Sequence, residues 1–306
     1  MNMLELIFAA ALMDTVIAPT SFGTVYVHEW GAVTFAEESV IFGANPQTDP
    51  NSDFIPPYQW EEPVARAPIV YFYGAQFSGT FTVSVHSGNF IETLPFPESL
   101  TNTTPMPPPQ SYNAVWEIWN TTQNQEYLVE EYSSVSEDML DIWRIPPSYV
   151  LEFSDGSQEK FVYYECALQP SSEDDFYPVL LQDNGAVLHP DYTGPAMWFV
   201  KDGGTVTLAR IMGDDPLQGI VTATGPQNIY PEILCDWAEG SMKSEELVSM
   251  WETWESWIFD GSWSGDTLLV FPLPDYTIEG MTTIYLQTDD YLDVEYSRFY
   301  LGILSN

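Results

Sequence analysis

A histidine and a glutamate stand side by side in VYVHEWGAVTF (25–35), a segment of otherwise mainly apolar residues. An imidazole and a carboxylate are a common pair in acid–base catalysis and in zinc sites. The zinc-hydrolase motif HExxH needs a second histidine one helical turn later, and HEWGA lacks it. Because the whole chain has three histidines, a metal-assisted hydrolase has to combine His28 and Glu29 with a distant ligand. His28 and Glu29 are the candidate catalytic residues of that alternative.

The same segment predicts a β-strand, in which successive side chains point to opposite faces. Glu29 then shares an apolar face with Val27 and Val33, whereas His28 lies on the other face with Trp30. A carboxylate on an apolar face needs a partner or a raised pKa. Glu29 is therefore the better candidate for a functional or network-forming acid.

Three structural explanations for Glu29 compete with catalysis. A bulge at Gly31 turns the side chain outwards, an arginine such as Arg66 or Arg298 pairs with it, or backbone amides satisfy it. Buried acids in folded proteins are usually structural partners. We therefore favour a structural role for Glu29.

The abundance of acids and aromatic residues raises a second hydrolytic alternative. Glycoside hydrolysis needs two carboxylates in a cleft, and the chain has 45 acidic residues, 11 Trp, 18 Tyr and 17 Phe. The same rings suit a carbohydrate-binding sheet, although most of them are expected in the core. No pair of acids is singled out by spacing.

Calcium is the one cofactor that the sequence suggests. SSEDDF (171–176) and TDDYLDVE (288–295) cluster oxygen ligands, with Asp174, Asp175, Asp289 and Asp290 as candidates. Neither segment has the EF-hand spacing, and we favour solvated acidic loops. Cys166 and Cys235 fit no metal motif, and form either one disulfide or two buried thiols.

The charge balance excludes several partners. Seven basic residues face 45 acidic ones, so the formal net charge is −38. This charge repels nucleic acid and anionic membranes and attracts cations and basic proteins. We favour solubility as its main role.

Residues 1–22 resemble a degenerate signal peptide, with a short apolar run but no basic residue before it. The run is too short to span a bilayer, and we expect no transmembrane segment. A buried N-terminal helix is the alternative. We expect an extracytoplasmic or secreted protein.

Strand patterns dominate the rest of the chain. TFTVSVH (80–86) alternates, and PIVYFYG (68–74) is a continuous apolar run. SEELVSMWETWESWI (244–258) instead has helical spacing, with Ser244 as the expected N-cap. We predict a mainly β protein of antiparallel, sandwich-like sheets, with a β-sandwich-like domain at 23–168 and a second β-rich domain or extension at 169–306 that carries a helical insertion at 229–259.

Five segments, in order, resemble those of an uncharacterised bacterial family of mostly predicted secreted proteins. HEWGAVTF (28–35), APIVYFY (67–73), EKFVYYEC (159–166), MWETWESWIF (250–259) and RFYLGIL (298–304) are similar to its HEWGTF, PVIYFY, EKFLFYRG, MVxTWxxSWF and RVFVGRIE segments. The sequence departs from the pattern at GAVTF and at Glu165–Cys166. The resemblance implies secretion and no mechanism.

The leading hypothesis is a secreted, acidic, β-rich binding or structural surface protein without catalytic activity. Carbohydrate or another protein are the partners we consider. The alternative is a hydrolase, metal-assisted or glycoside-directed, that uses Glu29 and His28.

Overall fold

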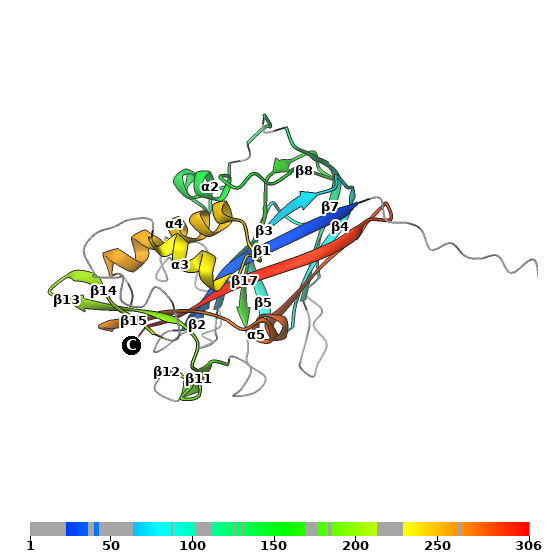
Figure 1. The fold of residues 1–306 in the computed structure, drawn as a ribbon. Coiled ribbons are helices and arrows are strands. Elements are labelled where there is room, and N and C mark those ends of the chain that lie inside the picture. Colours follow the sequence, from blue (N-terminus) through cyan, green and yellow to red (C-terminus); the bar gives the residue numbers. More distant parts are fainter. Residues whose placement is uncertain are drawn as a thin grey trace, which may run out of the picture.

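The computed structural model describes residues 23–35, 40–42, 64–86, 88–101, 112–124, 126–129, 131–168, 177–182, 185–212, 229–261, 263 and 265–305. Two stacked sheets and a layer of helices make up this part of the chain (Figure 1). The mainly β, sandwich-like fold predicted from the sequence is confirmed.

The larger sheet has nine strands in the order β14-β13-β15-β17-β1-β2-β3-β10-β5, and β1 also pairs with β3. Its strands are β1 (Thr24–Phe35), β2 (Val40–Phe42), β3 (Val64–Gly74), β5 (Gly88–Leu94), β10 (Val162–Leu168), β13 (Ala196–Asp202), β14 (Thr205–Met212), β15 (Thr267–Pro272) and β17 (Asp293–Ser305).

The smaller sheet has six strands, with β16-β4-β7-β8-β9 in line and β6 paired to β7. They are β4 (Gly79–Val85), β6 (Ser99–Thr101), β7 (Tyr112–Thr122), β8 (Val150–Phe153), β9 (Gln158–Glu159) and β16 (Thr282–Thr288). A separate hairpin joins β11 (Val179–Gln182) to β12 (Gly185–Leu188).

Most strand pairs are antiparallel, but the long central pair is not. β1 and β17 run parallel over their whole register, from Thr24 opposite Asp293 to Phe35 opposite Leu304. Figure 1 shows these two strands, at opposite ends of the colour scale, side by side across the molecule. The predicted boundary near residue 169 does not separate two sheets, because β10 and β13 belong to the same nine-stranded sheet.

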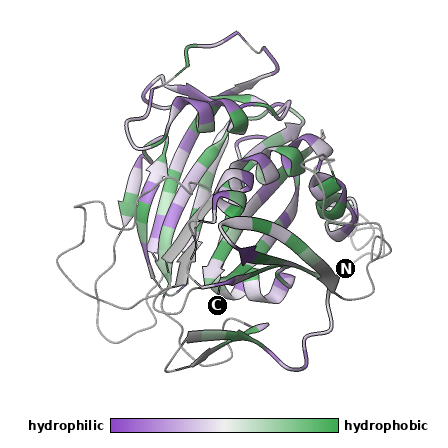
Figure 2. Ribbon diagram, turned by 90° about the vertical axis from the view of Figure 1, so that its left-hand side faces the viewer, coloured by the Kyte–Doolittle hydropathy of each residue, from purple (hydrophilic) through white to green (hydrophobic). Residues whose placement is uncertain are grey.

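Alternation along the strands produces two apolar cores. Val27 and Phe72 of the larger sheet pack against Phe81 and Trp116 of the smaller sheet inside the sandwich. The opposite face of the larger sheet packs against helices, with Trp30 in that second core. Figure 2 shows the helices lying over this face, with apolar and polar residues alternating along the strands.

The helices are α2 (Glu137–Trp143), α3 (Ile229–Trp237), α4 (Ser244–Asp260) and α5 (Asp275–Met281). The predicted insertion at 229–259 corresponds to α3 and α4. The apolar stripe of α4 is buried as predicted, at Leu247, Trp251, Trp254 and Ile258.

The N-cap of α4 differs from the prediction. It is Lys243, whose backbone N–H donates to the Glu246 side chain, and not Ser244. No helix among the described residues is long and apolar enough to cross a membrane.

Candidate functional site

Glu29 lies inside the sandwich, fully buried, on the face predicted from the alternation of β1. A register shift does occur beside Gly31, but the extra residue is on β3, between Arg66 and Ile69. The strand β1 therefore keeps its alternation, and Glu29 still points into the core.

Glu29 is paired with Arg298, one of the two arginines suggested as its partner. The residues are direct neighbours on β1 and β17, and Arg298 Nε donates to Glu29 Oε2 at 2.5 Å. The Tyr164 hydroxyl donates to the other oxygen, Oε1, at 2.7 Å. Arg298 also donates to the carbonyl and hydroxyl oxygens of Thr282, at 2.8 and 2.6 Å.

Burial and the charges of this network determine the protonation states of Arg298 and Tyr164. Burial opposes the charged form of Arg298, but the Glu29 carboxylate, Tyr300 and Tyr164 together outweigh it and raise the pKa of the guanidinium above its ordinary value. Burial and then the charge of Glu29 raise the pKa of Tyr164. Arg298 thus stays a cation and Tyr164 a neutral donor. Each of these two side chains donates a hydrogen bond to one carboxylate oxygen of Glu29.

His28 belongs to a different network, on the helix side of the same sheet. Its Nδ1 lies 3.0 Å from Oε2 of Glu246, a fully buried acid in the first turn of α4. The Tyr73 hydroxyl donates to Oε1 of Glu246 at 2.7 Å, and Lys243 Nζ lies 3.6 Å from the centre of the Tyr73 ring. His28 anchors α4 to the sheet.

His28 and Glu29 thus point to opposite faces of β1, as expected for successive residues of a strand. The structure does not bring them together: one faces the α4 terminus and the other the sandwich interior. Neither network places the two side chains around a common substrate position.

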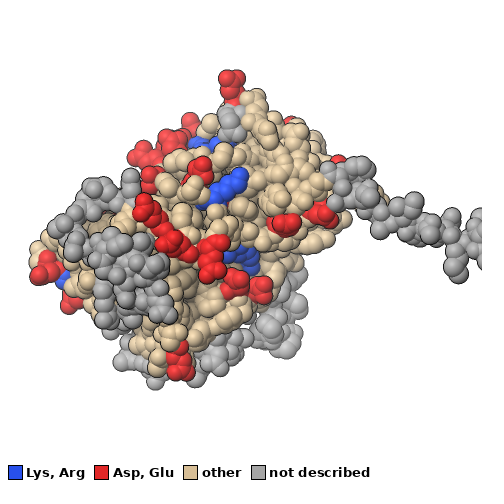
Figure 3. All heavy atoms as spheres, in the orientation of Figure 1, with Lys and Arg blue, Asp and Glu red and all other residues tan. Residues whose placement is uncertain are grey.

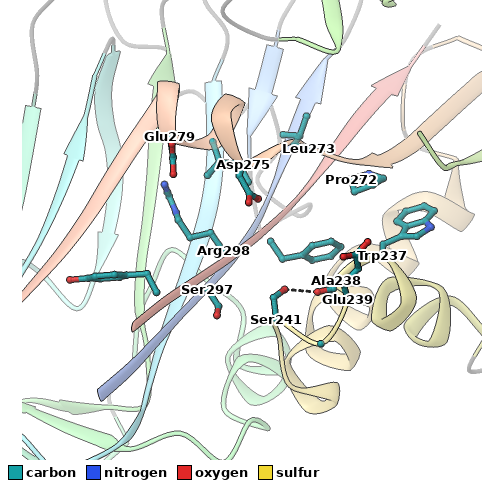
Figure 4. Close-up of a pocket in the computed structure, with 14 residues that line it drawn as sticks. Trp237, Ala238, Glu239, Ser241, Pro272, Leu273, Asp275, Glu279, Ser297 and Arg298 are labelled. Atoms are coloured by element: carbon teal, nitrogen blue, oxygen red, sulfur yellow. Dashed lines mark hydrogen bonds between the residues drawn. The ribbon is translucent and has the colours of Figure 1, made fainter. Parts of the chain in front are cut away.

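A cleft of about 660 Å³ opens beside Arg298. Three parts of the chain form its walls (Figure 4). They are β17, the segment from the end of β15 through α5, and the turn between α3 and α4. Its lining includes Trp237, Leu273, Ile278, Tyr296 and Phe299. The guanidinium that seals Glu29 inside the sandwich is therefore also part of a cleft wall.

Acidic groups stand on two walls of this cleft. Asp275 and Glu279 come from α5, and Glu239 from the α3–α4 turn, and all three side chains are exposed. Within the described part of the chain, no lysine, arginine or histidine forms an ion pair with any of them. Figure 3 shows acidic side chains gathered where α3, α5 and β17 meet. Since Arg298 is already paired with Glu29, the cleft presents an excess of negative charge.

The remaining predicted site residues lie elsewhere. Asp289 and Asp290 are in the turn between β16 and β17, where Asp289 accepts a hydrogen bond from the Ser78 hydroxyl at 2.7 Å. Asp174 and Asp175 lie outside the described residues. No group of three or more His, Cys, Asp or Glu in the described ranges is arranged to hold a metal ion.

The two cysteines are free thiols. Cys166 is buried in the sandwich, where burial and then the nearby charge of Glu165 raise the pKa of its thiol. A thiol held in the protonated form is a weak nucleophile.

No family model matches this chain, and no curated protein matches it. Among solved structures, the Fcho1 Mu homology domain of Danio rerio with a bound Eps15 peptide is similar to it. The similarity covers 94% of this chain and 96% of that chain, at 8% identity and a TM-score of 0.28. At that score it supports no conclusion.

The cleft was not predicted from the sequence. Its acids come from a short helix and a turn, which carry no motif. A local signal did exist for α5, because Asp275 is an acid in the first turn of the helix. Nothing local indicates that α5 lies beside β17.

Proposed function

We propose that this protein is a non-catalytic binding protein whose cleft between α5, β17 and the α3–α4 turn takes cationic ligands. The observation that carries the proposal is the set of three exposed acids, Glu239, Asp275 and Glu279, on two facing walls of one cleft. The neighbouring Arg298 adds no free positive charge, because Glu29 neutralises it.

The lining favours an organic cation over a bare metal ion. Apolar and aromatic side chains, among them Leu273, Tyr296 and Phe299, share the cleft with the acids. An aliphatic stem covers such surfaces while its charged end meets a carboxylate, as lysine and arginine side chains do. A basic segment of another protein has both properties, in agreement with the protein partner considered from the sequence.

The alternative of a hydrolase draws no support from this geometry. His28 and Glu29 face opposite sides of β1, and each is engaged by neighbouring side chains. Extracytoplasmic location remains part of our proposal and rests on the sequence of residues 1–22. Fractionation of cells that express the full chain tests it, and recovery in the cytoplasm alone would contradict it.

Calorimetric titration with a hexalysine peptide and with spermine tests the cleft. A net charge of −38 attracts polycations everywhere, so the design needs a variant of equal charge. The cleft variant is Glu239→Gln/Asp275→Asn/Glu279→Gln. The matched control is Glu131→Gln/Asp141→Asn/Asp202→Asn, three exposed acids outside the cleft.

We expect the cleft variant to lose at least about tenfold in affinity for both cations, equivalent to about 1.4 kcal/mol. The control variant should change affinity by less than about twofold, because distant exposed charges are largely screened at physiological salt. Equal losses in the two variants would show that the polycations respond to total charge alone, and would refute the proposal.

A further inference from the structure

Within the described ranges, one edge of β17 is without a strand partner along the cleft. β1 covers the other edge over the full length of β17. On the cleft side, β15 pairs only with Leu301–Ser305. Among the described residues, no strand pairs with the stretch from Asp293 to Tyr300 on this side.

Two hydrogen bonds show which backbone groups point into the cleft. Tyr300 O accepts from Leu273 N, on the β15 side, at 2.8 Å. Asp293 N donates to Gly23 O, on the β1 side, at 3.1 Å. The backbone N–H and C=O of one strand residue point to the same side, and this side alternates from each residue to the next. The N–H and C=O groups of Tyr296 and Arg298 therefore point to the cleft side, as those of Tyr300 do. No described residue forms a hydrogen bond with these four groups.

The path of the described chain after β15 leaves this edge without a strand. β15 runs antiparallel to β17 as far as Pro272, opposite Leu301. Pro274 and α5 then carry the chain away from the sheet. The cleft begins at Pro272 and Leu273 and continues along β17, in the line that a longer β15 would follow (Figure 4).

We infer that an extended basic peptide binds this cleft as an added strand, antiparallel to β17 and in line with β15. The inference rests on the proposed function and names its ligand class. Unpaired strand edges pair readily with extended chains. The helix α5 and the α3–α4 turn flank this edge, an arrangement that suits a single extended segment better than the sheet of a second globular protein.

The positions of the acids specify the pattern of the peptide. Successive side chains of the added strand point to opposite faces. One face meets Asp275 and Glu279, on the side to which Arg298 points (Figure 4). The other face meets Glu239 and Ser241, on the side of Ser297. Two adjacent basic residues therefore place one positive charge against the acids of each wall. A peptide with isolated basic residues places a charge against only one wall at a time.

The test is a backbone N-methyl scan of an acetylated, amidated Lys-Arg-Lys-Arg-Lys-Arg peptide, titrated into the full chain. Each N-methyl group removes one donor and leaves every charge in place. We expect losses of at least about tenfold at alternate residues, where the N–H faces β17. The residues between them should stay within about twofold, because their N–H groups point away from β17.

Three results are distinguishable. Losses that alternate along the peptide support strand addition. If all methylated peptides bind within about twofold of the parent while the cleft variant still loses affinity, strand addition is wrong and cation binding stands. If the parent peptide binds wild-type protein and the cleft variant equally, both proposals fail.

Discussion

Glu29 and Arg298 stand opposite each other on the parallel strands β1 and β17, and Arg298 Nε donates to Glu29 Oε2. The acid is fully buried, whereas 13% of the Arg298 side chain remains exposed. The arginine thus satisfies a charge inside the sandwich and forms part of a cleft outside it. This pairing explains why a carboxylate is tolerated on an apolar strand face.

Replacing Arg298 tests the structural role of this pair. Arg298→Leu should lower the free energy of unfolding by about 3–5 kcal/mol, because it leaves Glu29 buried without a counter-charge. The double variant Glu29→Leu/Arg298→Leu should recover most of this loss, since no unpaired charge remains. Urea unfolding measures both. A single variant within about 1 kcal/mol of wild type would show that Glu29 does not depend on Arg298.

Glu246 should be the main anchor of α4. It accepts hydrogen bonds from the Tyr73 hydroxyl and the Lys243 N–H, and contacts His28. Glu246→Ala leaves these buried groups unsatisfied and should cost at least about 1–3 kcal/mol in unfolding free energy. Tryptophan fluorescence during unfolding reports it, because Trp251 and Trp254 lie on the same helix.

The neighbouring Glu245 provides the control for that measurement. It lies in the same helical turn but is exposed. Glu245→Ala should change stability by less than about 0.5 kcal/mol. Equal effects of the two substitutions would mean that first-turn charge alone, and not the buried network, holds α4 in place.

The protein should lose stability in alkali. Burial raises the pKa values of Tyr71, Tyr164 and Tyr300 well above the ordinary value of 10.0. Above that pH the unfolded chain releases these protons and the folded one keeps them, so each tyrosine lowers the unfolding free energy by about 1.4 kcal/mol per pH unit. Below it they contribute no pH dependence.

Tyrosinate absorbance during a pH titration checks this prediction. We expect a cooperative rise that coincides with loss of the far-ultraviolet circular dichroism signal of the strands. Gradual ionisation of all tyrosines near pH 10, with the fold intact, would contradict burial of these three rings.

Much of the local structure could be predicted because its causes are local. Alternation in β1 places Glu29 inward, and helical spacing places Trp251 and Trp254 in the core. The short helices α2 and α5 were not predicted. For α2 a signal existed, since Ser136 caps the helix and Glu137 and Asp138 follow it.

The candidate site depends on contacts that local patterns do not encode. Arg298 was one of two possible partners for Glu29, and only the parallel register of β1 and β17 decides between it and Arg66. The cleft joins residues near 239, 275 and 298, which are brought together by sheet topology. Strand order depends on pairing between distant segments, for which a single sequence carries little information.

The most direct measurement of cationic peptide binding in the cleft is hydrogen–deuterium exchange of the full chain with and without the Lys-Arg peptide. We predict that the peptide slows exchange at the amides of Tyr296 and Arg298, which face the cleft, and leaves the sheet edge at β14 unchanged. Unaltered exchange at Tyr296 and Arg298 under saturating peptide would contradict binding along this edge of β17.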